Sequence, residues 1–494
     1  MSLFSPRLLQ LWTGGRWRGG EPSVITGFNI DSREVQEGEL FVAIQTEKRD
    51  GHDYVEAAEA AGASAALVQR YVEASRMPQL VVLDTVAALQ TIATTHRFTF
   101  EGPVIAVTGS CGKTSTKDLL QLLLGGHNVL STSGNLNNHL GVPLTLLGLD
   151  MAHHDIAVVE AGAGSPGDIS ELGGMIRPEA AIITMVGPAH LDRLGNVLGV
   201  AKEKASLGHF VHPNGFVLFP ADCLQYPAFR HFEIESIALG TPDEAYKQFA
   251  AVKSAYYWTE TTETTRKETE SIESTNRGSI ETISGIQGGC RLLLRQPPAI
   301  DVAFEVPRLS QGMMRNAAFS ILAALKLGAT AEMVQQRLHE WKPSRHRGEI
   351  IAQGSKHFYV DCYNANPASF VDTLSAFDQS MAPDAPRLYV LGCMAELGAV
   401  AGAWHHWVGN RVRLRPGDHA IIIGDESHAF AEGIVEAGND VNLITIAESL
   451  DDIRHIVDEF DGSILLKGSR RYRLETLLPP KLKSGNSHGM IKIG

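Results

Sequence analysis

Short apolar runs alternate with helix-type segments from the beginning of the chain. Within residues 1–98 the apolar runs are 39–44, 65–68 and 80–83, and an alanine- and glutamate-rich stretch at 54–61 stops at Gly62. Apolar runs of about four to eight residues between turn residues are typical of buried strands. The alternation therefore predicts a small α/β unit over residues 1–98.

Residues 99–342 repeat this alternation on a larger scale. The sequence predicts strands at 104–107, 156–160 and 181–186, and helices at 117–124, 200–207 and 315–327. Strands that alternate with helices usually form a mostly parallel sheet covered by the helices. At about 259–283 threonine and glutamate dominate, and apolar residues are scarce. Such a composition buries too little surface to fold, so we predict a flexible insertion there.

Residues 343–494 alternate again, with apolar strands at 358–361, 388–391, 420–423 and 464–467. Polar residues follow each strand directly, and ligands of such sheets bind at the carboxyl ends of the strands. We predict a tail from Lys481 onward. The fold class predicted for the whole chain is α/β.

Composition limits the classes of function. The chain has 494 residues, of which 44% are hydrophobic and 20% charged, as in globular proteins, and it exceeds the roughly 250–300 residues of a single core. A net charge of −13 argues against a general nucleic-acid-binding surface. The first residues lack the continuous apolar stretch of a secretion signal, and no apolar run approaches the ~20 residues of a membrane-spanning helix, so we expect neither feature. Five scattered cysteines predict reduced thiols, so we expect a cytoplasmic protein.

A glycine-rich turn follows the strand at 104–107 and precedes a helix. Its sequence is Thr108-Gly109-Ser110-Cys111-Gly112-Lys113-Thr114-Ser115. Backbone N–H groups and the helix dipole make such a turn a phosphate cradle. Lys113 would reach the terminal phosphates, and Thr114 would offer its hydroxyl to Mg²⁺. Although Val107 stands where the general pattern has glycine, the Gly-Lys-Thr triplet in this context predicts a phosphate loop.

Other polar residues are expected near this loop. Glu160 ends a strand and is a candidate Mg²⁺ ligand, and His190 follows the next strand and should fall in the same crevice. The loop that contains Asn135, Asn137 and Asn138 could bind a polar ligand or only cap the next helix.

Two pairs of residues, Lys202 with Lys204 and Ser32 with Arg33, can be interpreted either as ordinary surface residues or as functional ones. Lys202 and Lys204 lie on one predicted helix, where most lysines are solvated. For Ser32 and Arg33, the residues alone favour a turn with a solvated arginine over an anion clamp.

Four spaced blocks carry a resemblance to a known family. They are Gly134-Asn-Leu-Asn-Asn138, Tyr363-Asn-Ala-Asn-Pro367, Met394-Ala-Glu-Leu-Gly398 and Lys467-Gly-Ser-Arg470. With the phosphate loop they are similar to the Mur ligases of peptidoglycan synthesis over nearly the whole chain. The resemblance implies a UDP-substrate-binding domain at 1–98, a central ATPase domain at 99–342 and a Rossmann-like ligase domain at 343–494.

The resemblance also implies a reaction. The four blocks resemble those Mur ligases that use ATP to join UDP-N-acetylmuramoyl-tripeptide to D-alanyl-D-alanine through an acyl phosphate. ADP and phosphate would be released, Mg²⁺ would accompany ATP, and the enzyme would act as a cytoplasmic monomer.

By the same resemblance, Lys113 together with Mg²⁺ on Thr114 and Glu160 would neutralise the β- and γ-phosphates. His190 would bind a second metal ion. Lys204 would become a carbamate that supports the metal, with Lys202 as the competing candidate.

The resemblance assigns binding roles as well. Asn316 would lie beside the adenine, and Arg347 and Asp361 would hold the γ-phosphate and the ribose. The substrate contacts that it implies are Ser32 and Arg33 for uridine diphosphate, and Asn135, Asn137, Asn138, Asn364 and Asn366.

Two other readings of the sequence stay open. A sister ligase, such as a folylpolyglutamate synthetase or the Mur ligase that adds the third residue, would share the phosphate loop, although the C-terminal blocks argue against it. A binding protein without activity should have lost Lys113, Glu160 or His190, and all three are present. The chain departs from the family pattern at Val360, at Cys393 and just before Asn316.

Overall fold

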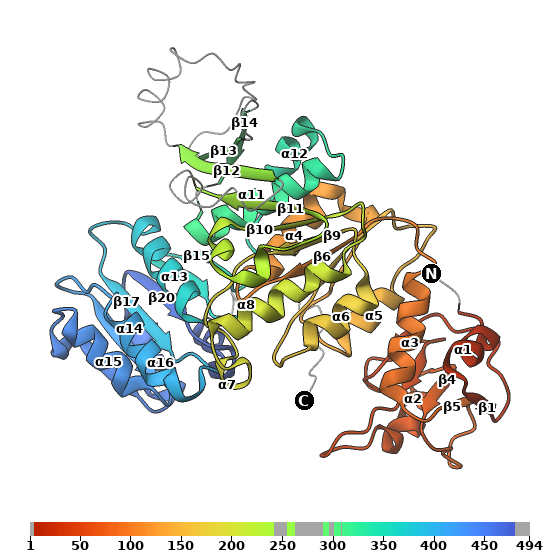
Figure 1. Ribbon diagram of the computed structural model, residues 1–494. Helices are drawn as coiled ribbons and strands as arrows, with labels where there is room; N and C mark the ends of the chain where they lie inside the picture. The colour runs from red at the N-terminus through yellow and green to blue at the C-terminus, as the bar shows by residue number, and fades with distance from the viewer. Residues whose placement is uncertain (1–3, 242–253, 262–289, 296–300, 308, 480–494) are drawn as a thin grey trace.

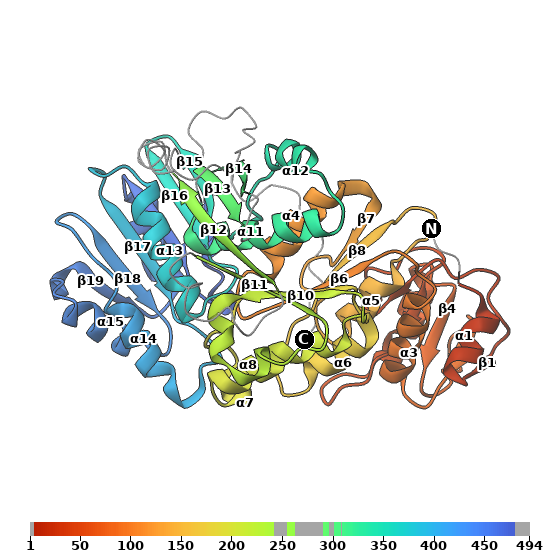
Figure 2. The ribbon, with the colours of Figure 1, turned by 45° about the horizontal axis from the view of Figure 1, so that its top comes forward.

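The computed structural model describes residues 4–241, 254–261, 290–295, 301–307 and 309–479. These residues form three α/β lobes in chain order, each built on its own sheet (Figure 1). Figure 2 shows the three lobes side by side, the N-terminal lobe in red to dark orange, the central lobe from orange through yellow to green, and the C-terminal lobe in blue. The predicted α/β class with three domains is confirmed. The boundaries at 98/99 and 342/343 stay predictions.

The N-terminal sheet has the strand order β1-β5-β4-β3-β2 and is parallel except between β1 and β5. Its strands are β1 (Arg16–Arg18), β2 (Phe28–Asn29), β3 (Leu40–Val42), β4 (Ala65–Val68) and β5 (Gln79–Val81). Its helices are α1 (Pro6–Thr13), α2 (Val55–Ala60) and α3 (Thr85–Arg97). The Asp84 carboxylate caps α3 by accepting hydrogen bonds from two backbone N–H groups of its first turn.

The central sheet has the order β14-β13-β12-β11-β10-β9-β6-β8-β7, parallel from β7 to β12 and antiparallel beyond. Its strands are β6 (Val104–Thr108), β7 (Val129–Ser131), β8 (Ile156–Glu160), β9 (Ala180–Ile183), β10 (Phe216–Pro220), β11 (Glu235–Gly240), β12 (Ser254–Thr261), β13 (Cys290–Arg295) and β14 (Asp301–Val306). The helices are α4 (Lys113–Leu124), α5 (Gly141–Leu147), α6 (Asp168–Ile176), α7 (Leu191–Leu194), α8 (Val197–Ala205), α11 (Gln311–Lys326) and α12 (Ala331–Leu338).

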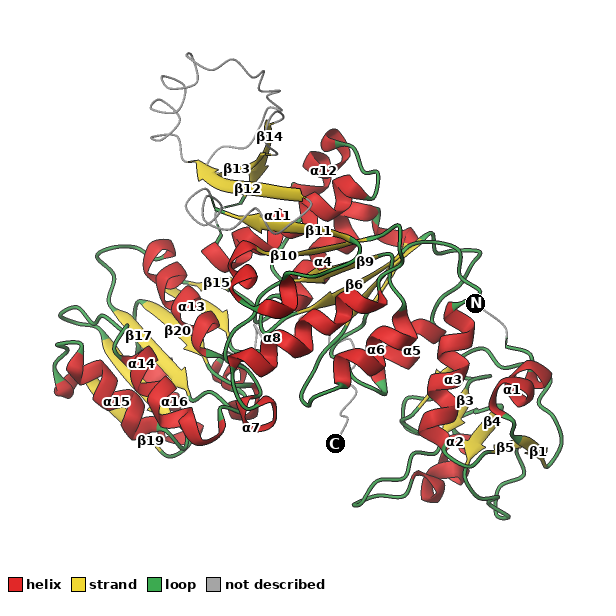
Figure 3. Ribbon diagram, in the orientation of Figure 1, coloured by secondary structure: helices red, strands yellow, loops and turns green. Residues whose placement is uncertain are grey.

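Helices cover both faces of the central sheet (Figure 3). In β6, Val104 and Ala106 face the core under α5, α6 and α8, whereas Ile105 and Val107 face the core under α4, α11 and α12. Burial on both faces explains why the sequence of this strand is apolar without alternation. The first core continues into the N-terminal lobe through α3, so these two lobes share one hydrophobic cluster.

The C-terminal sheet has the order β15-β16-β20-β17-β18-β19, antiparallel only between β15 and β16. Its strands are β15 (Glu349–Gln353), β16 (Lys356–Asp361), β17 (Arg387–Gly392), β18 (His419–Ile423), β19 (Ile444–Ala447) and β20 (Ser463–Lys467). The helices are α13 (Pro367–Ser380), α14 (Ala401–Gly409), α15 (Ser427–Glu436) and α16 (Leu450–Glu459).

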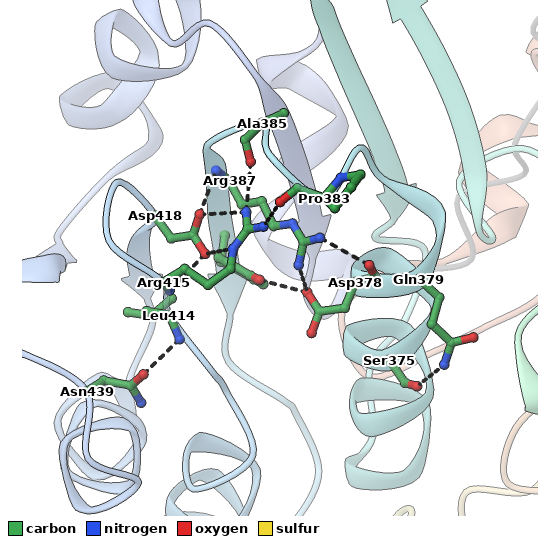
Figure 4. Close-up of polar contacts among 11 residues, drawn as sticks. Ser375, Asp378, Gln379, Pro383, Ala385, Arg387, Leu414, Arg415, Asp418 and Asn439 are labelled. Atoms are coloured by element: carbon green, nitrogen blue, oxygen red, sulfur yellow. Dashed lines mark hydrogen bonds and ion pairs between the residues drawn. The ribbon is translucent and has the colours of Figure 1, made fainter.

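A polar network holds the amino end of β17 (Figure 4). Arg387 donates to the Asp378 carboxylate over 2.6 Å, and the Asp418 carboxylate accepts from the Arg387 backbone N–H over 3.0 Å. Arg415 donates to Asp418 and to backbone carbonyls nearby. These ion pairs lie at the strand end opposite to the carboxyl tips, so they brace the sheet without occupying the edge where ligands bind.

The predicted flexible insertion is wrong at its beginning. Residues 259–261 belong to β12 and pair with 291–293 of β13. The aromatic run Tyr256-Tyr257-Trp258 and the β-branched threonines that follow it favour an extended strand, which the low-complexity composition concealed. The rest of the predicted insertion and the predicted tail lie outside the described residues. In the described part of the chain, no helix is both long and apolar enough to cross a membrane.

Trp258 should therefore contribute to the stability of the central lobe. Its side chain is 5% exposed in the core under α11. Replacing a buried tryptophan with alanine costs about 3–5 kcal/mol, so Trp258→Ala should lower the melting temperature by about 6 °C or more. Trp407→Ala, at a position 37% exposed on α14, is the control and should cause a smaller shift. Equal shifts in calorimetry would contradict a structural role for β12.

Candidate functional site

The turn between β6 and α4 requires glycine at two positions. Gly109 and Gly112 have φ angles of 149° and 86°. A Cβ atom at Gly109 would lie 2.1 Å from Oγ1 of Thr184, and one at Gly112 would lie 2.5 Å from Oδ1 of Asn316. The loop backbone is thus in close contact with its neighbours, and only glycine allows its N–H groups to turn toward a ligand.

A cavity of about 170 Å³ opens from this loop into the space between the central and C-terminal lobes. Lys113 begins α4, and its Nζ donates to the Gly109 carbonyl over 2.8 Å. Thr108 and Gly109 form the base of the loop. The predicted site residues that line the cavity are Ser110, Cys111, Gly112, Lys113, Thr114, Ser115, Asn135, Asn137, Glu160, Asn316, Arg347, Asp361, Asn364 and Asn366.

Glu160, at the tip of β8, is 2% exposed, and each of its carboxylate oxygens accepts a hydrogen bond. Its Oε2 accepts from the Thr114 hydroxyl over 2.9 Å, and its Oε1 accepts from the Asn137 amide over 2.8 Å. A hydroxyl beside a carboxylate at a phosphate loop is an oxygen donor set that suits Mg²⁺. The described residues hold no group of three or more His, Cys, Asp or Glu side chains arranged for a metal ion.

In the loop before α5, one asparagine bonds to the start of the helix and two others lie at the cavity. The Asn138 side chain accepts hydrogen bonds from the N–H groups of Leu140 and Gly141, over 3.1 and 2.9 Å, and so caps α5. Asn137 contacts Glu160 instead, and Asn135 lines the cavity.

Burial separates the two lysines of α8. Lys202 is exposed, whereas Lys204 is 1% exposed. Burial, reinforced by the charge of Lys113, lowers the pKa of Lys204 to about 7, although Glu203, Asp168 and Glu160 act in the opposite direction. The interpretation of Lys204 as a solvated lysine is therefore wrong, because its amine lies inside the lobe within electrostatic reach of Lys113 and Glu160.

His190 lies at a second cavity, which it lines with Lys113, Asn137, Asn138 and Glu171 among others. It adopts a left-handed backbone conformation, and its Nδ1 is 2.6 Å from Oε2 of Glu396 in the C-terminal lobe. The hydrogen bond from His190 lowers the pKa of Glu396, so this carboxylate is ionised at neutral pH. Sequence analysis found the motif that contains Glu396 but not this contact.

The C-terminal lobe supplies the opposite wall of the first cavity. Asp361, at the tip of β16, accepts from Nζ of Lys467 over 2.8 Å and from the Thr373 hydroxyl. The Arg347 guanidinium stacks on Tyr363, 4.1 Å from the ring centroid.

Two more contacts complete this wall. Lys467 also donates to the Asn364 carbonyl over 3.0 Å, and the Asn366 amide donates to the Ser110 carbonyl of the phosphate loop over 3.0 Å. Lys467 and Thr373 were missed as site residues. A charged residue ending the apolar strand β20 was the visible signal for Lys467.

Ser32 and Arg33 lie apart from these two cavities. They line a third cavity in the N-terminal lobe, with Arg49, Tyr54 and, from the central lobe, Leu140. The Arg33 side chain is 74% exposed and forms an ion pair with Asp31. Two guanidinium groups at one cavity are suited to an anionic ligand.

Three family descriptions match successive parts of the chain. They are "Mur ligase family, catalytic domain" at 24–97, "Mur ligase middle domain" at 107–292 and "Mur ligase, glutamate ligase domain" at 346–470.

Full-length relatives carry a more specific name. The UDP-N-acetylmuramoyl-tripeptide–D-alanyl-D-alanine ligase of Escherichia coli (strain K12) is 31% identical over 474 residues, which cover 94% of this chain and 96% of that protein. The ligase of the same name from Bacillus subtilis (strain 168) is 28% identical, and 94% of each chain is covered.

Solved structures have the same architecture. MurF from Acinetobacter baumannii superimposes with a TM-score of 0.78 at 27% identity and covers 97% of this chain and 98% of its own. MurF from Thermotoga maritima in complex with ADP has a similar fold, with a TM-score of 0.71 over 91% of this chain and 96% of its own. Because a relative 31% identical over nearly the full length and three successive domain descriptions agree, the chain belongs to the Mur ligase family.

Proposed function

We propose that this ligase joins D-alanyl-D-alanine to UDP-N-acetylmuramoyl-tripeptide. Mur ligases are ATP-dependent enzymes that form amide bonds, and the relatives from E. coli and B. subtilis are named for this pair of substrates. One observation carries the proposal: Lys113, Asn137 and Asn364 line both the cavity at the phosphate loop and the cavity at His190. A triphosphate in the first cavity and a carboxylate in the second would meet at Lys113.

The chemistry explains why a cation is needed where the cavities meet. An oxygen of the tripeptide carboxylate attacks the γ-phosphorus, and the bond from that phosphorus to the ADP oxygen breaks. Both reactants are anions, so the Lys113 ammonium would offset their repulsion and the charge of the transferring phosphoryl group. Mg²⁺, when bound by Thr114 and Glu160, would supply further positive charge at the phosphates.

The second half of the reaction forms the amide bond. The neutral amine of the dipeptide attacks the carbonyl carbon of the acyl phosphate, the C–O bond to phosphate breaks, and the amine nitrogen loses a proton. His190, at the second cavity, would act as a metal ligand. Lys204 would act as a carbamate that supports the metal ion.

The remaining residues would bind the substrates. Asp361 would accept the ribose hydroxyls, while Asn316 and Arg347 would hold the adenine and the γ-phosphate. Ser32 and Arg33 would bind uridine diphosphate, and the other substrate contacts would be Asn135, Asn137, Asn138, Asn364 and Asn366. We propose the boundaries 1–98, 99–342 and 343–494 for the three domains that supply these residues. The monomeric state and the cytoplasmic location stay predictions.

A substrate panel tests the proposed function. Phosphate release should require ATP, UDP-N-acetylmuramoyl-tripeptide and D-alanyl-D-alanine together, because the acyl phosphate is consumed only by the dipeptide amine. Parallel reactions contain UDP-N-acetylmuramoyl-dipeptide with a diamino acid, or a folate with glutamate. Faster phosphate release in either parallel reaction would assign the chain to a sister ligase instead.

Lys113→Ala should lower dipeptide-dependent phosphate release by at least about 10²-fold, the size of effect seen when one group that stabilises developing charge is removed. The melting temperature should stay close to that of the parent, because the hydrogen bond that Lys113 donates to the Gly109 carbonyl lies within its own loop. Lys202→Ala, at an exposed lysine, is the control for loss of a positive charge. Activity of Lys113→Ala within tenfold of the parent would contradict the assignment.

Lys204 should be the carbamylated lysine. Lys204→Ala should lower turnover strongly, and added short-chain carboxylates should restore part of it by occupying the space of the carbamate. Lys202→Ala should be silent, and Lys113→Ala should not be rescued. If Lys202→Ala alone is impaired and rescued, the wrong lysine has been chosen; if neither variant is impaired, the protein does not depend on a carbamate.

A further inference from the structure

His190 and Glu396 form a direct contact between the central and C-terminal lobes. Their Nδ1 and Oε2 atoms are 2.6 Å apart, and both residues have left-handed backbones, with φ angles of 51° and 63°. Non-glycine residues adopt this conformation at an energetic cost, and they are concentrated at functional sites. The contact is therefore held by its surroundings on both sides.

The surroundings are closely packed. Leu191 and Leu194 of α7 share a hydrophobic cluster with Met394 and Leu397, which flank Glu396. A Cβ atom at Gly398 would lie 3.1 Å from the Cα atom of Asp192. The turn that carries His190 and the loop that carries Glu396 thus fit together backbone to backbone.

This contact selects one form of the imidazole. An ionised carboxylate only accepts hydrogen bonds, so Nδ1 of His190 carries the hydrogen that Glu396 accepts. In the neutral ring, the lone pair then lies on Nε2. His190 also lines the cavity shared with Lys113.

We propose that Glu396 is a positioning residue that fixes the His190 tautomer, and that it does so only while the C-terminal lobe is docked on α7. Docking of this lobe would thereby prepare His190 for a divalent cation in the cavity. A histidine that donates one ring N–H to a carboxylate is the usual arrangement behind a metal-binding imidazole nitrogen. The role of this cation in the ligase reaction rests on the proposed function. The effect of Glu396 on the His190 tautomer does not.

Stability alone does not account for the contact. The two side chains are 30% and 55% exposed, and ion pairs with this exposure contribute little to the free energy of unfolding. The C-terminal lobe offers a matched pair, in which Nε2 of His406 is 3.0 Å from Oε2 of Glu436, with exposures of 35% and 63%. This second pair joins α14 to α15 within one lobe, so it controls for loss of a His–Glu pair that does not link lobes.

The test measures the His190 tautomer by ¹⁵N NMR on protein labelled at histidine, with the signal assigned from His190→Asn. At about pH 8.5, above the ordinary imidazole pKa of about 6.5, the parent should show one dominant tautomer with hydrogen on Nδ1. Glu396→Ala should give a mixture, because no acceptor remains. Glu396→Gln should also give a mixture, because an amide can accept or donate. Glu436→Ala should leave the His190 signal unchanged.

Binding of Mn²⁺, measured by electron paramagnetic resonance in the presence of ADP, supplies the second readout. Loss of a partner that orients a metal ligand weakens metal binding about 10- to 100-fold, so Glu396→Ala should show a loss of this size and Glu436→Ala should not. An unchanged tautomer in both Glu396 variants overturns the proposal, whatever their turnover. A shifted tautomer with unchanged Mn²⁺ affinity supports the positioning role and removes His190 from the metal ligands. Failure of the substrate panel with a shifted tautomer would reject the proposed function alone.

Discussion

The buried carboxylate of Glu160 is the constraint on which the candidate site depends. An ionised carboxylate at 2% exposure is costly unless its oxygens are bonded, and here one oxygen accepts from Thr114 and the other from Asn137. The Glu160 backbone N–H donates to Oγ1 of Thr132 over 2.8 Å. The start of α4, the asparagine loop and the segment after β7 are therefore tied to the tip of β8. Removal of any partner would leave part of a buried charge unsatisfied, so the phosphate loop is held in place before a ligand arrives.

The two outer lobes are attached to the central lobe in different ways. The N-terminal lobe shares a hydrophobic cluster with it, and the buried Arg97 at the end of α3 donates to the carbonyls of Ile176 and Arg177. The C-terminal lobe packs on α7, where Leu191 and Leu194 share a hydrophobic cluster with Leu397. It also makes polar contacts with the phosphate loop and with the amino end of α11, where the Gly312 N–H donates to Asp372 over 2.9 Å. The second attachment therefore combines a hydrophobic cluster at α7 with separate polar contacts at the phosphate loop and at α11. Since Asp361, Arg347 and Lys467 all belong to the C-terminal lobe, closure of the nucleotide cavity depends on this attachment.

The two buried lysines near the candidate site lie in different electrostatic surroundings. Lys113 and Lys204 are both cationic side chains near Glu160, and burial together with the charge of Lys113 lowers the pKa of Lys204. Lys467 is equally buried but bonded to Asp361 and to a carbonyl. Burial and a nearby cation both disfavour the charged form of a lysine. The two buried lysines thus differ in their surroundings, because Lys467 donates to a carboxylate and Lys204 lies near the cation of Lys113.

The sequence by itself determined the local elements and the class of chemistry. The runs at 65–68 and 156–160 became β4 and β8 at the predicted residues, and the run at 464–467 became β20, which begins one residue earlier at Ser463. Strands buried on both faces are apolar apart from a polar residue at the tip, and this made them visible in the sequence. The phosphate loop was equally visible, since its glycines and lysine are adjacent in the chain. Tertiary structure decided which lysine is buried, that Asp361 meets Lys467 and His190 meets Glu396, and that residues 259–261 extend a strand. These contacts bring together residues that are far apart in the chain. They depend on the order of the strands and on how the lobes pack, and neither leaves a periodic pattern in the sequence.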